Sequence, residues 1–275
     1  MELFKRMIVG IIGIPLLLWI YYSGGAILYC FLGIISFLCS FELNNLILKL
    51  KKQTIVIVSL YAVLLFFCIA DITFLNGIFP STVKNEPAIT RFFATLFIIM
   101  FITPILNIVL GKIKGIVNAL STITFTCLYI AVGFGFLYHL SLINRTIVPI
   151  LAVLIWTCDT FAYFIGMKFG QHRGVFKVSP NKSLEGFIAG FVFTFFASVV
   201  VLYIFPDSYT PKHLVYFTIS VGIFGQYGDL FESMIKRDMG IKNSSNLIPG
   251  HGGVLDRFDS LLISAPVLFI LMSLF

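Results

Sequence analysis

The chain has 275 residues, of which 59% are hydrophobic and 11% are charged, and its mean hydropathy is +1.03. A water-soluble domain of this length has no core large enough to bury so much apolar surface, so the composition excludes that class and indicates an all-α, polytopic membrane protein. The net charge of +7 is typical of basic loops that face anionic lipid, and with no separate basic domain the sequence predicts no nucleic-acid partner.

Nine apolar stretches are long enough to cross a bilayer as helices, which takes roughly 17–25 residues each. We place these spans at 7–23, 25–41, 54–70, 92–110, 116–143, 146–167, 186–205, 213–228 and 260–275. The five spans within residues 1–145 carry little polar chemistry, and we interpret this part as a transmembrane scaffold. The four spans within 146–275 form the candidate catalytic region of what we expect to be one integral domain.

The distribution of Lys and Arg predicts how the spans are oriented. With the N-terminus in the cytoplasm, 15 of the 19 basic residues fall in cytoplasmic segments, as the positive-inside rule requires. The same orientation places the polar loops 168–185 and 229–259 in the cytoplasm, on the side where nucleotides are found. The sequence therefore predicts a multi-pass cell-membrane protein with a cytoplasmic site.

The first polar feature of the second half is Asp159, which lies inside an apolar span. A carboxylate in a span is costly and is functional by default. Tyr163 follows four residues later and shares its helix face. A packing role for Asp159 is the alternative, and we expect both residues to support a site.

The second feature is the loop that begins with Ser179 and Pro180 and leads into the next span. Its composition predicts a helix start with Ser183 as the N-cap. Lys182, beside the free backbone N–H groups of that start, is a candidate phosphate receptor, and an ordinary positive-inside anchor is the alternative. Glu185, in the first turn, is a candidate supporting residue.

The third feature is a concentration of charge, because nine of the 19 basic and 12 acidic residues fall between Asp229 and Asp259. If the eighth span continues as a helix past Asp229, then Ser233, Lys236 and Arg237 follow at offsets of 4, 7 and 8 on one face. This face would present an acid, a hydroxyl and two cations in one stripe.

A glycine-rich turn and two acids complete this stretch. Gly252 and Gly253, beside His251, allow backbone N–H groups to approach a phosphate, although His251 itself could be structural. Asp256 and Asp259 lie three apart at the start of the last helix. Together with the aspartate at 229 they offer oxygen ligands that suit Mg²⁺ bound to phosphates, and the alternative is an ion-pair network that closes the helix bundle.

Several blocks resemble the phosphatidate cytidylyltransferases, also called CDP-diacylglycerol synthases. The longest is Ser233-x-x-Lys236-Arg237-x4-Lys242, continued by Pro249-x-His251-Gly252-Gly253-x-x-Asp256-Arg257-x-Asp259. In the same order as in that family stand Asp159-Thr160-x-Ala162-Tyr163-x-x-Gly166, Ser179-Pro180-x-Lys182-Ser183-x-Glu185-Gly186 and Gly228-Asp229-Leu230. The resemblance covers about residues 156–265, and the first 150 residues match only in being spans.

The resemblance implies that CTP and phosphatidate react to give CDP-diacylglycerol and pyrophosphate in phospholipid biosynthesis. It implies Mg²⁺ held by Asp229, Asp256 and Asp259, with Lys236 and Arg237 as further catalytic residues. Substrate phosphates would be bound by Lys182, Ser183, Ser233, His251, Gly252, Gly253 and Arg257. A second cation such as K⁺ and a homodimer are left open.

Two positions depart from the family pattern. Asn243 stands where the family usually has an acid, and Gln171 stands where a Lys is expected. The alternatives to the cytidylyltransferase reaction are another CTP-dependent lipid enzyme, an ion-coupled transporter, and a catalytically silent relative with Asn243 as its lesion.

Overall fold

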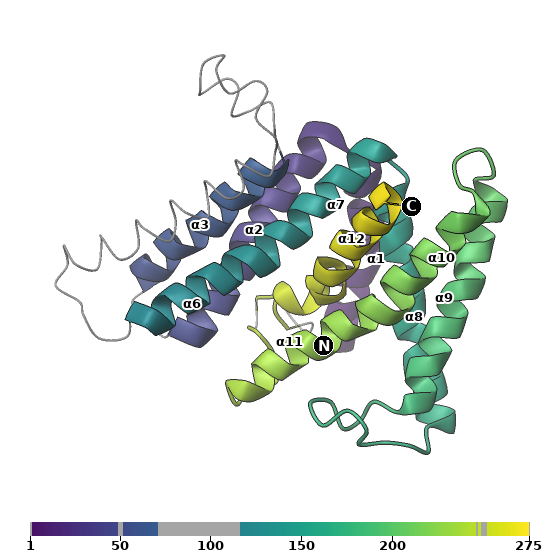
Figure 1. The fold of residues 1–275 in the computed structure, drawn as a ribbon. Coiled ribbons are helices and arrows are strands. Elements are labelled where there is room, and N and C mark those ends of the chain that lie inside the picture. Colours follow the sequence, from purple (N-terminus) through teal and green to yellow (C-terminus); the bar gives the residue numbers. More distant parts are fainter. Residues whose placement is uncertain (1, 49–51, 71–115, 246, 249–251, 275) are drawn as a thin grey trace, which may run out of the picture. The chain divides into compact units, whose positions relative to one another are not determined.

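The computed structural model describes residues 2–48, 52–70, 116–245, 247–248 and 252–274 (Figure 1). Within these ranges the regular secondary structure is helical, with two isolated bridges and no strand, which confirms the all-α class. The helices are α1 (Glu2–Ser23), α2 (Gly25–Leu48), α3 (Lys52–Ala70), α6 (Ile116–Thr126), α7 (Val132–Ile143), α8 (Ile147–Phe169), α9 (Leu184–Ile204), α10 (Pro211–Ile219), α11 (Gln226–Asp238) and α12 (Leu255–Leu274). π-Helical segments at Cys127–Ala131 and Ser220–Gly225 join α6 to α7 and α10 to α11.

Four helices of the described residues are long and apolar enough to cross a membrane: Gly25–Leu48, Val117–Ile143, Ile147–Phe169 and Leu184–Ile204. They correspond to four of the predicted spans. Gly10–Ser23 and Thr54–Phe67 are shorter apolar helices. The predicted span at 92–110 lies outside the described residues. The full number of nine spans and the cytoplasmic N-terminus stay predictions.

The chain divides into two compact units, one formed by Met1–Gly25 with Leu140–Phe275 and the other by Ala26–His139. In the second unit a buried amide links three helices. Asn44 of α2 donates to Ser59 Oγ of α3 at 3.3 Å and accepts from Thr126 Oγ1 of α6 at 3.0 Å. Such satisfied polar bridges are a common way to join helices in an apolar bundle. The functional division that we predict at residue 145 stays a prediction.

The first unit contains every candidate site residue that the structure describes. Its α8 and α9 lie side by side and are joined by the loop over residues 170–183 (Figure 1). The two helices approach closely because glycines face each other: a Cβ on Gly186 would lie 2.6 Å from Ala162 O and 3.1 Å from Gly166 Cα. The tight packing of the two helices therefore holds the two ends of the polar loop close together.

The α10–α11 helix runs from Pro211 to Asp238 through its π-helical segment. The prediction that the helix continues past Asp229 is therefore confirmed. α11 packs against α12 at Gly228, where a Cβ would lie 2.7 Å from Asp259 O and 3.1 Å from Ser260 Cα. This backbone-to-backbone contact brings the acids of the two helices near one another.

Candidate active site

A cavity of about 430 Å³ lies among α8, α9, α11 and the loop between α8 and α9. Its lining includes Asp159 and Tyr163 from α8, Lys182 and Ser183 from the loop, and Asp229 from α11. These five residues come from three sequence blocks, and the fold brings them together at one cavity. The volume is within the range of small-molecule sites.

The cap of α9 fixes the end of the loop at this cavity. Ser183 has an extended backbone, and its Oγ accepts a hydrogen bond from Gly186 N at 3.1 Å, which confirms the predicted N-cap. Its side chain is buried. Because the cap is held against α8, the preceding Lys182 is placed at the cavity wall.

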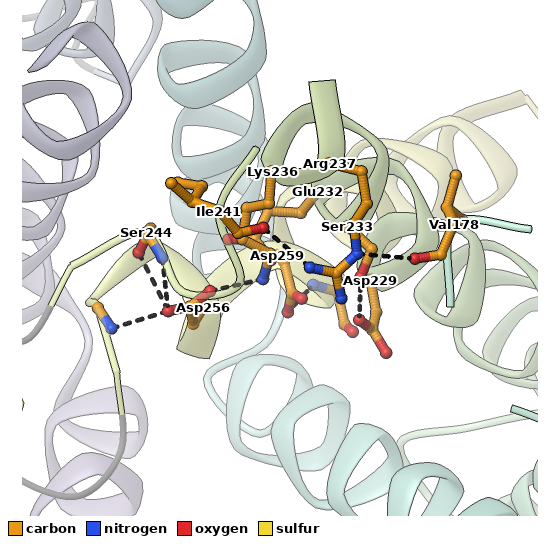
Figure 2. A network of polar contacts seen from close by, with 12 residues as sticks. Val178, Asp229, Glu232, Ser233, Lys236, Arg237, Ile241, Ser244, Asp256 and Asp259 are labelled. Atoms are coloured by element: carbon orange, nitrogen blue, oxygen red, sulfur yellow. Dashed lines mark hydrogen bonds and ion pairs between the residues drawn. The ribbon is translucent and has the colours of Figure 1, made fainter. Parts of the chain in front are cut away.

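Lys182 Nζ donates to Asp229 Oδ2, and we call these two residues the pocket pair. Ser233 Oγ, one turn along α11, lies 3.5 Å from Asp229 Oδ1 (Figure 2). The side chains of the pair are 37% and 31% exposed. An ion pair this open to solvent contributes little to stability, about 0–1 kcal/mol, so a charged ligand can replace either partner at small cost.

Gln226 anchors the start of α11, immediately after the π-helical segment. Its Nε2 donates to Gly222 O at 2.6 Å and to Phe187 O of α9 at 3.0 Å. π-Helical turns leave backbone groups that need partners and are frequent at functional sites. Gln226 supplies such a partner and ties α11 to α9 beside the cavity, which holds Asp229 in place.

A second group of charges lies between α11 and α12, and we call Glu232, Lys236, Asp256 and Asp259 the buried cluster (Figure 2). Lys236 Nζ donates to Glu232 Oε2 within α11 and to Asp256 Oδ1 across the interface, at 2.6 Å in the second case. The exposed fractions are 1% for Glu232, 12% for Lys236 and 7% for Asp256. These charges depend on one another, because little water reaches them.

The second oxygen of Asp256 organises the turn before α12. Asp256 Oδ2 accepts from Gly253 N at 2.8 Å, and from Ser244 N and Oγ at 3.1 Å each. Gly252 has a φ of +85°, and a Cβ there would lie 2.7 Å from the same oxygen, so only glycine fits. Asp256 thus fastens the glycine turn to the helix that follows.

The acids of the buried cluster have pKa values that are shifted in different directions. Burial, and then the nearby charge of Asp259, raise the pKa of Glu232. Burial also raises the pKa of Asp259, helped by the charges of Asp229 and Asp159. For Asp256 burial acts in the same direction, but the bonds from Lys236 and Gly253 outweigh it and lower its pKa. A cation near Asp259 would relieve this repulsion.

The remaining predicted residues lie in varied surroundings. Arg237 bonds to backbone carbonyls, with Nη1 2.8 Å from Ile241 O and Nε 3.3 Å from Val178 O. Glu185 accepts from the backbone N–H of His172 at 3.1 Å and bonds to its ring, so it supports the α8–α9 loop. These contacts hold the polypeptide chain around the site.

Three further positions lie in the segment that leads into α12 or at the start of that helix. Arg257 is exposed at the start of α12. His251 lies outside the described residues. Asn243, the departure from the family pattern, is exposed and lies near Gly252, with its Cγ 3.7 Å from where a Cβ of that glycine would stand. Asn243 therefore belongs to the same turn as the glycine block.

Sequence reasoning missed Glu232, Gln226 and Ser244. Glu232 precedes Lys236 by one helical turn, and this spacing was a usable signal for an ion pair. Gln226 is a lone polar residue near the end of the predicted span 213–228, which was a weaker signal. Nothing local distinguishes Ser244, because its partner Asp256 is twelve residues away.

Among the described residues, no group of three or more His, Cys, Asp and Glu side chains is arranged to hold a metal ion. Asp229 and Asp256 each face a lysine. Asp259 Oδ1 accepts from Ser260 N at 2.7 Å. The predicted set of three aspartates stays a prediction.

Comparisons with known proteins agree with the sequence blocks. The profile described as the cytidylyltransferase family matches residues 4–275. A phosphatidate cytidylyltransferase of Staphylococcus saprophyticus is 29% identical over 267 residues, which are 97% of this chain and 98% of that protein. Proteins of the same name from Bacillus subtilis and Staphylococcus aureus are 36% identical over 156 residues and 38% identical over 144 residues. Those two matches cover 56% and 52% of this chain, and 58% and 55% of the relatives.

Proposed function

The chain belongs to the cytidylyltransferase family, and on that premise we propose that it transfers the cytidylyl group of CTP to phosphatidate. In this reaction a phosphate oxygen of phosphatidate attacks the α-phosphorus of CTP. The bond from that phosphorus to the bridging oxygen breaks, and pyrophosphate leaves with the electron pair. The products are CDP-diacylglycerol and pyrophosphate, so the protein is a nucleotidyltransferase of phospholipid biosynthesis.

The observation that carries the proposal is the composition of the cavity wall. The pocket pair lies in the same cavity as Tyr163 and Met167 of α8, a helix long enough to cross a membrane. These two residues are each 60% exposed. A ligand with an anionic head and two apolar chains matches such a wall, because its phosphate can meet Lys182 while its chains remain in lipid. Phosphatidate is such a ligand.

The chemistry requires positioning and charge neutralisation more than a strong base. The phosphate of phosphatidate is already anionic at neutral pH and can act as the nucleophile. Lys182 and Lys236 would neutralise substrate phosphates, and Ser233 would donate to a phosphate oxygen. Arg237, Arg257 and the turn with His251, Gly252 and Gly253 stay proposed substrate contacts.

Mg²⁺ is the proposed cofactor, with Asp229, Asp256 and Asp259 as the residues that would hold it. The proposed ligands are of the type that Mg²⁺ prefers, because they are all carboxylate oxygens. Asp259 is also buried near other acids, whose repulsion a cation would reduce. Asp256 fits less well, because its oxygens already accept four hydrogen bonds. When bound, the ion would neutralise the phosphates of CTP and the departing pyrophosphate. A second cation such as K⁺ is left open.

The proposed setting is a multi-pass protein of the cell membrane with nine spans and a site that faces the cytoplasm. The excess of Lys and Arg in the predicted cytoplasmic segments supports this orientation. CTP would then arrive from the cytoplasm and phosphatidate from the bilayer. A homodimer is left open.

The test uses the full chain, purified in detergent micelles, with phosphatidate, Mg²⁺ and CTP labelled at the α-phosphate. We expect labelled CDP-diacylglycerol, and we expect none when EDTA is present or phosphatidate is omitted. A labelled lipid would also show that Asn243 is compatible with activity.

Other outcomes identify the alternatives. Phosphorylated lipid formed from γ-labelled CTP would replace the proposal with a CTP-dependent lipid kinase. Folded protein that yields no labelled lipid would contradict the proposal, and Asn243→Asp would then show whether the missing acid is the cause. Product that forms equally with EDTA would overturn the metal assignment alone.

A further inference from the structure

Glu232 is a buried acid of α11 for which the reaction outlined above has no use. Its side chain is 1% exposed, and Oε2 accepts from Lys236 Nζ. Oε1 is buried and has no hydrogen-bond partner among the described residues. A carboxylate oxygen in that state is costly, and such exceptions in a folded protein call for an explanation.

Balancing the charge of Lys236 does not explain Glu232. Asp256 already pairs with the same ammonium group, at 2.6 Å. Glu232 adds a second acid to that lysine, and the nearby charge of Asp259 opposes it. A hydrophobic residue at 232 would leave the Lys236–Asp256 pair intact and would avoid the orphaned oxygen.

The arrangement does fix the direction of the lysine. An ammonium group carries three N–H donors and rotates freely on a flexible stem. In the part of the chain that the structure describes, Glu232 and Asp256 each accept a hydrogen bond from one of the three N–H groups (Figure 2). Glu232 lies one turn before Lys236 on α11, and Asp256 lies on the facing helix α12. Two fixed hydrogen bonds leave the third donor with one direction. With either carboxylate removed, the group could turn about the remaining bond.

We propose that Glu232 is a positioning residue: together with Asp256 it orients the third N–H of Lys236 toward a phosphate of the substrate. The inference rests on the proposed function, in which Lys236 contacts a phosphate. It adds that the contact depends on a second acid that makes no substrate contact itself. A preoriented donor contributes more to a transition state than one that must be ordered on binding.

The test is a double-mutant cycle on kcat/KM for CTP in detergent micelles, with wild type, Glu232→Gln, Lys236→Ala and the double variant. The amide keeps the shape of Glu232 but replaces its two carboxyl oxygens by one amide oxygen, a weaker acceptor for Lys236 Nζ, and an NH₂ group that can only donate. We expect Glu232→Gln to lower kcat/KM about tenfold or more, the range for a hydrogen bond between charged groups. In the Lys236→Ala background we expect Glu232→Gln to lower kcat/KM by less than about twofold, because the ammonium group that Glu232 orients is absent.

Asp238→Asn is the matched control, because it removes an exposed carboxylate from the last residue of the same helix. It should leave kcat/KM unchanged. Equal losses from Glu232→Gln in both backgrounds would contradict the proposal, since Glu232 would then act independently of Lys236. No loss in the wild-type background would contradict it as well.

A variant that does not fold, or a failure of the proposed function, can each be distinguished from a failure of the proposal for Glu232. If Glu232→Gln does not give monodisperse protein, Glu232→Asp takes its place in the cycle under the same criterion, because it keeps the charge and withdraws it by one methylene. If wild-type protein forms no CDP-lipid, the proposed function fails. The cycle is then read from CTP affinity by calorimetry, where additive losses would overturn the role of Glu232 and non-additive losses would support it.

Discussion

The pocket pair and the buried cluster use the same chemistry, a lysine held by aspartate, in two different environments. Lys182 and Asp229 are about one-third exposed and line a cavity. Lys236 and Asp256 are about one-tenth exposed and are enclosed between two helices. Opening the first pair costs about 0–1 kcal/mol, whereas removing one partner of a buried pair costs about 3–5 kcal/mol.

This difference indicates that the pocket pair and the buried cluster have different roles in the site. The open pair can exchange its partner for a ligand, because water already competes for both groups. The closed cluster cannot do so cheaply, and it is suited to hold α11, α12 and the glycine turn in one geometry. Replacement of an ion-pair partner by a ligand is therefore expected at the cavity, whereas at the helix interface the existing ion pairs would stay in place and hold the groups that meet the ligand.

The largest expected effect separates turnover from stability. Asp256→Ala should abolish turnover, by about a thousandfold or more. It should also lower the melting temperature, because Lys236 keeps only Glu232 as a partner and the turn at Gly253 loses its acceptor. Asp229→Ala should lose a similar amount of turnover with little change in melting temperature, because its ion pair is exposed. Activity assays and thermal unfolding in detergent measure both effects.

Two results would contradict this comparison. Wild-type-like turnover of Asp256→Ala, with the protein present in the membrane at an equal amount, would remove Asp256 from the site. Equal losses of melting temperature in the two variants would show that exposure does not distinguish the pocket pair from the buried cluster.

A smaller effect is expected where the helices that carry the cluster touch. In Gly228→Ala the added Cβ would lie 2.7 Å from the backbone oxygen of Asp259, so α11 and α12 must move apart. Overpacking of this kind costs about 1–3 kcal/mol, and we expect a lower melting temperature together with reduced turnover. Gly13→Ala, in α1 of the same unit, has no atom within 4 Å of its Cβ and serves as the neutral control.

The melting temperature of Gly228→Ala tests whether the close contact between α11 and α12 is required. If Gly228→Ala unfolds at the same temperature as Gly13→Ala, then the close contact between α11 and α12 is not needed to position the acids. A loss of turnover without a loss of melting temperature would shift the role of Gly228 from packing to the cavity.

The smallest effect is expected at the edge of the site, in the loop over residues 170–183. The hydrogen bond from the His172 ring, followed by backbone hydrogen bonds, lowers the pKa of Glu185 to about 2 from an ordinary value of 4.5. A lowered acid pKa stabilises the fold above the ordinary value, and this contribution is lost as the pH falls from 4.5 toward 2. Pepsin cleavage of the loop should therefore increase over that interval.

Glu185→Gln should make the same loop susceptible at all pH values tested, while turnover at neutral pH changes by less than about twofold. Asp207→Asn, in the exposed connection between α9 and α10, is the matched control and should leave cleavage of the loop unchanged. If the pH profile of cleavage is the same in Glu185→Gln and wild type, the His172–Glu185 contact does not hold the loop.

Local sequence rules determined several parts of this site. Ser183 at a helix start predicted a cap, because its hydroxyl can satisfy a free N–H, and the cap is present. The spacing of Asp229 and Ser233 predicted a shared helix face past the end of the apolar run, and α11 has that face. Four of the predicted spans are helices that can cross a membrane, because apolar runs in a bilayer must satisfy their backbone internally.

The tertiary structure alone decided which charges are paired and which are accessible. Helical periodicity shows that Asp229 and Lys236 lie on one stripe, but not that one faces a cavity and the other faces α12. The partners Lys182 and Asp229 are 47 positions apart, and Lys236 and Asp256 are 20 apart, so no local rule connects them. Burial sets the strength of an ion pair, and burial is a property of the packed helices, so the exchangeable and the fixed parts of the site could be told apart only in three dimensions.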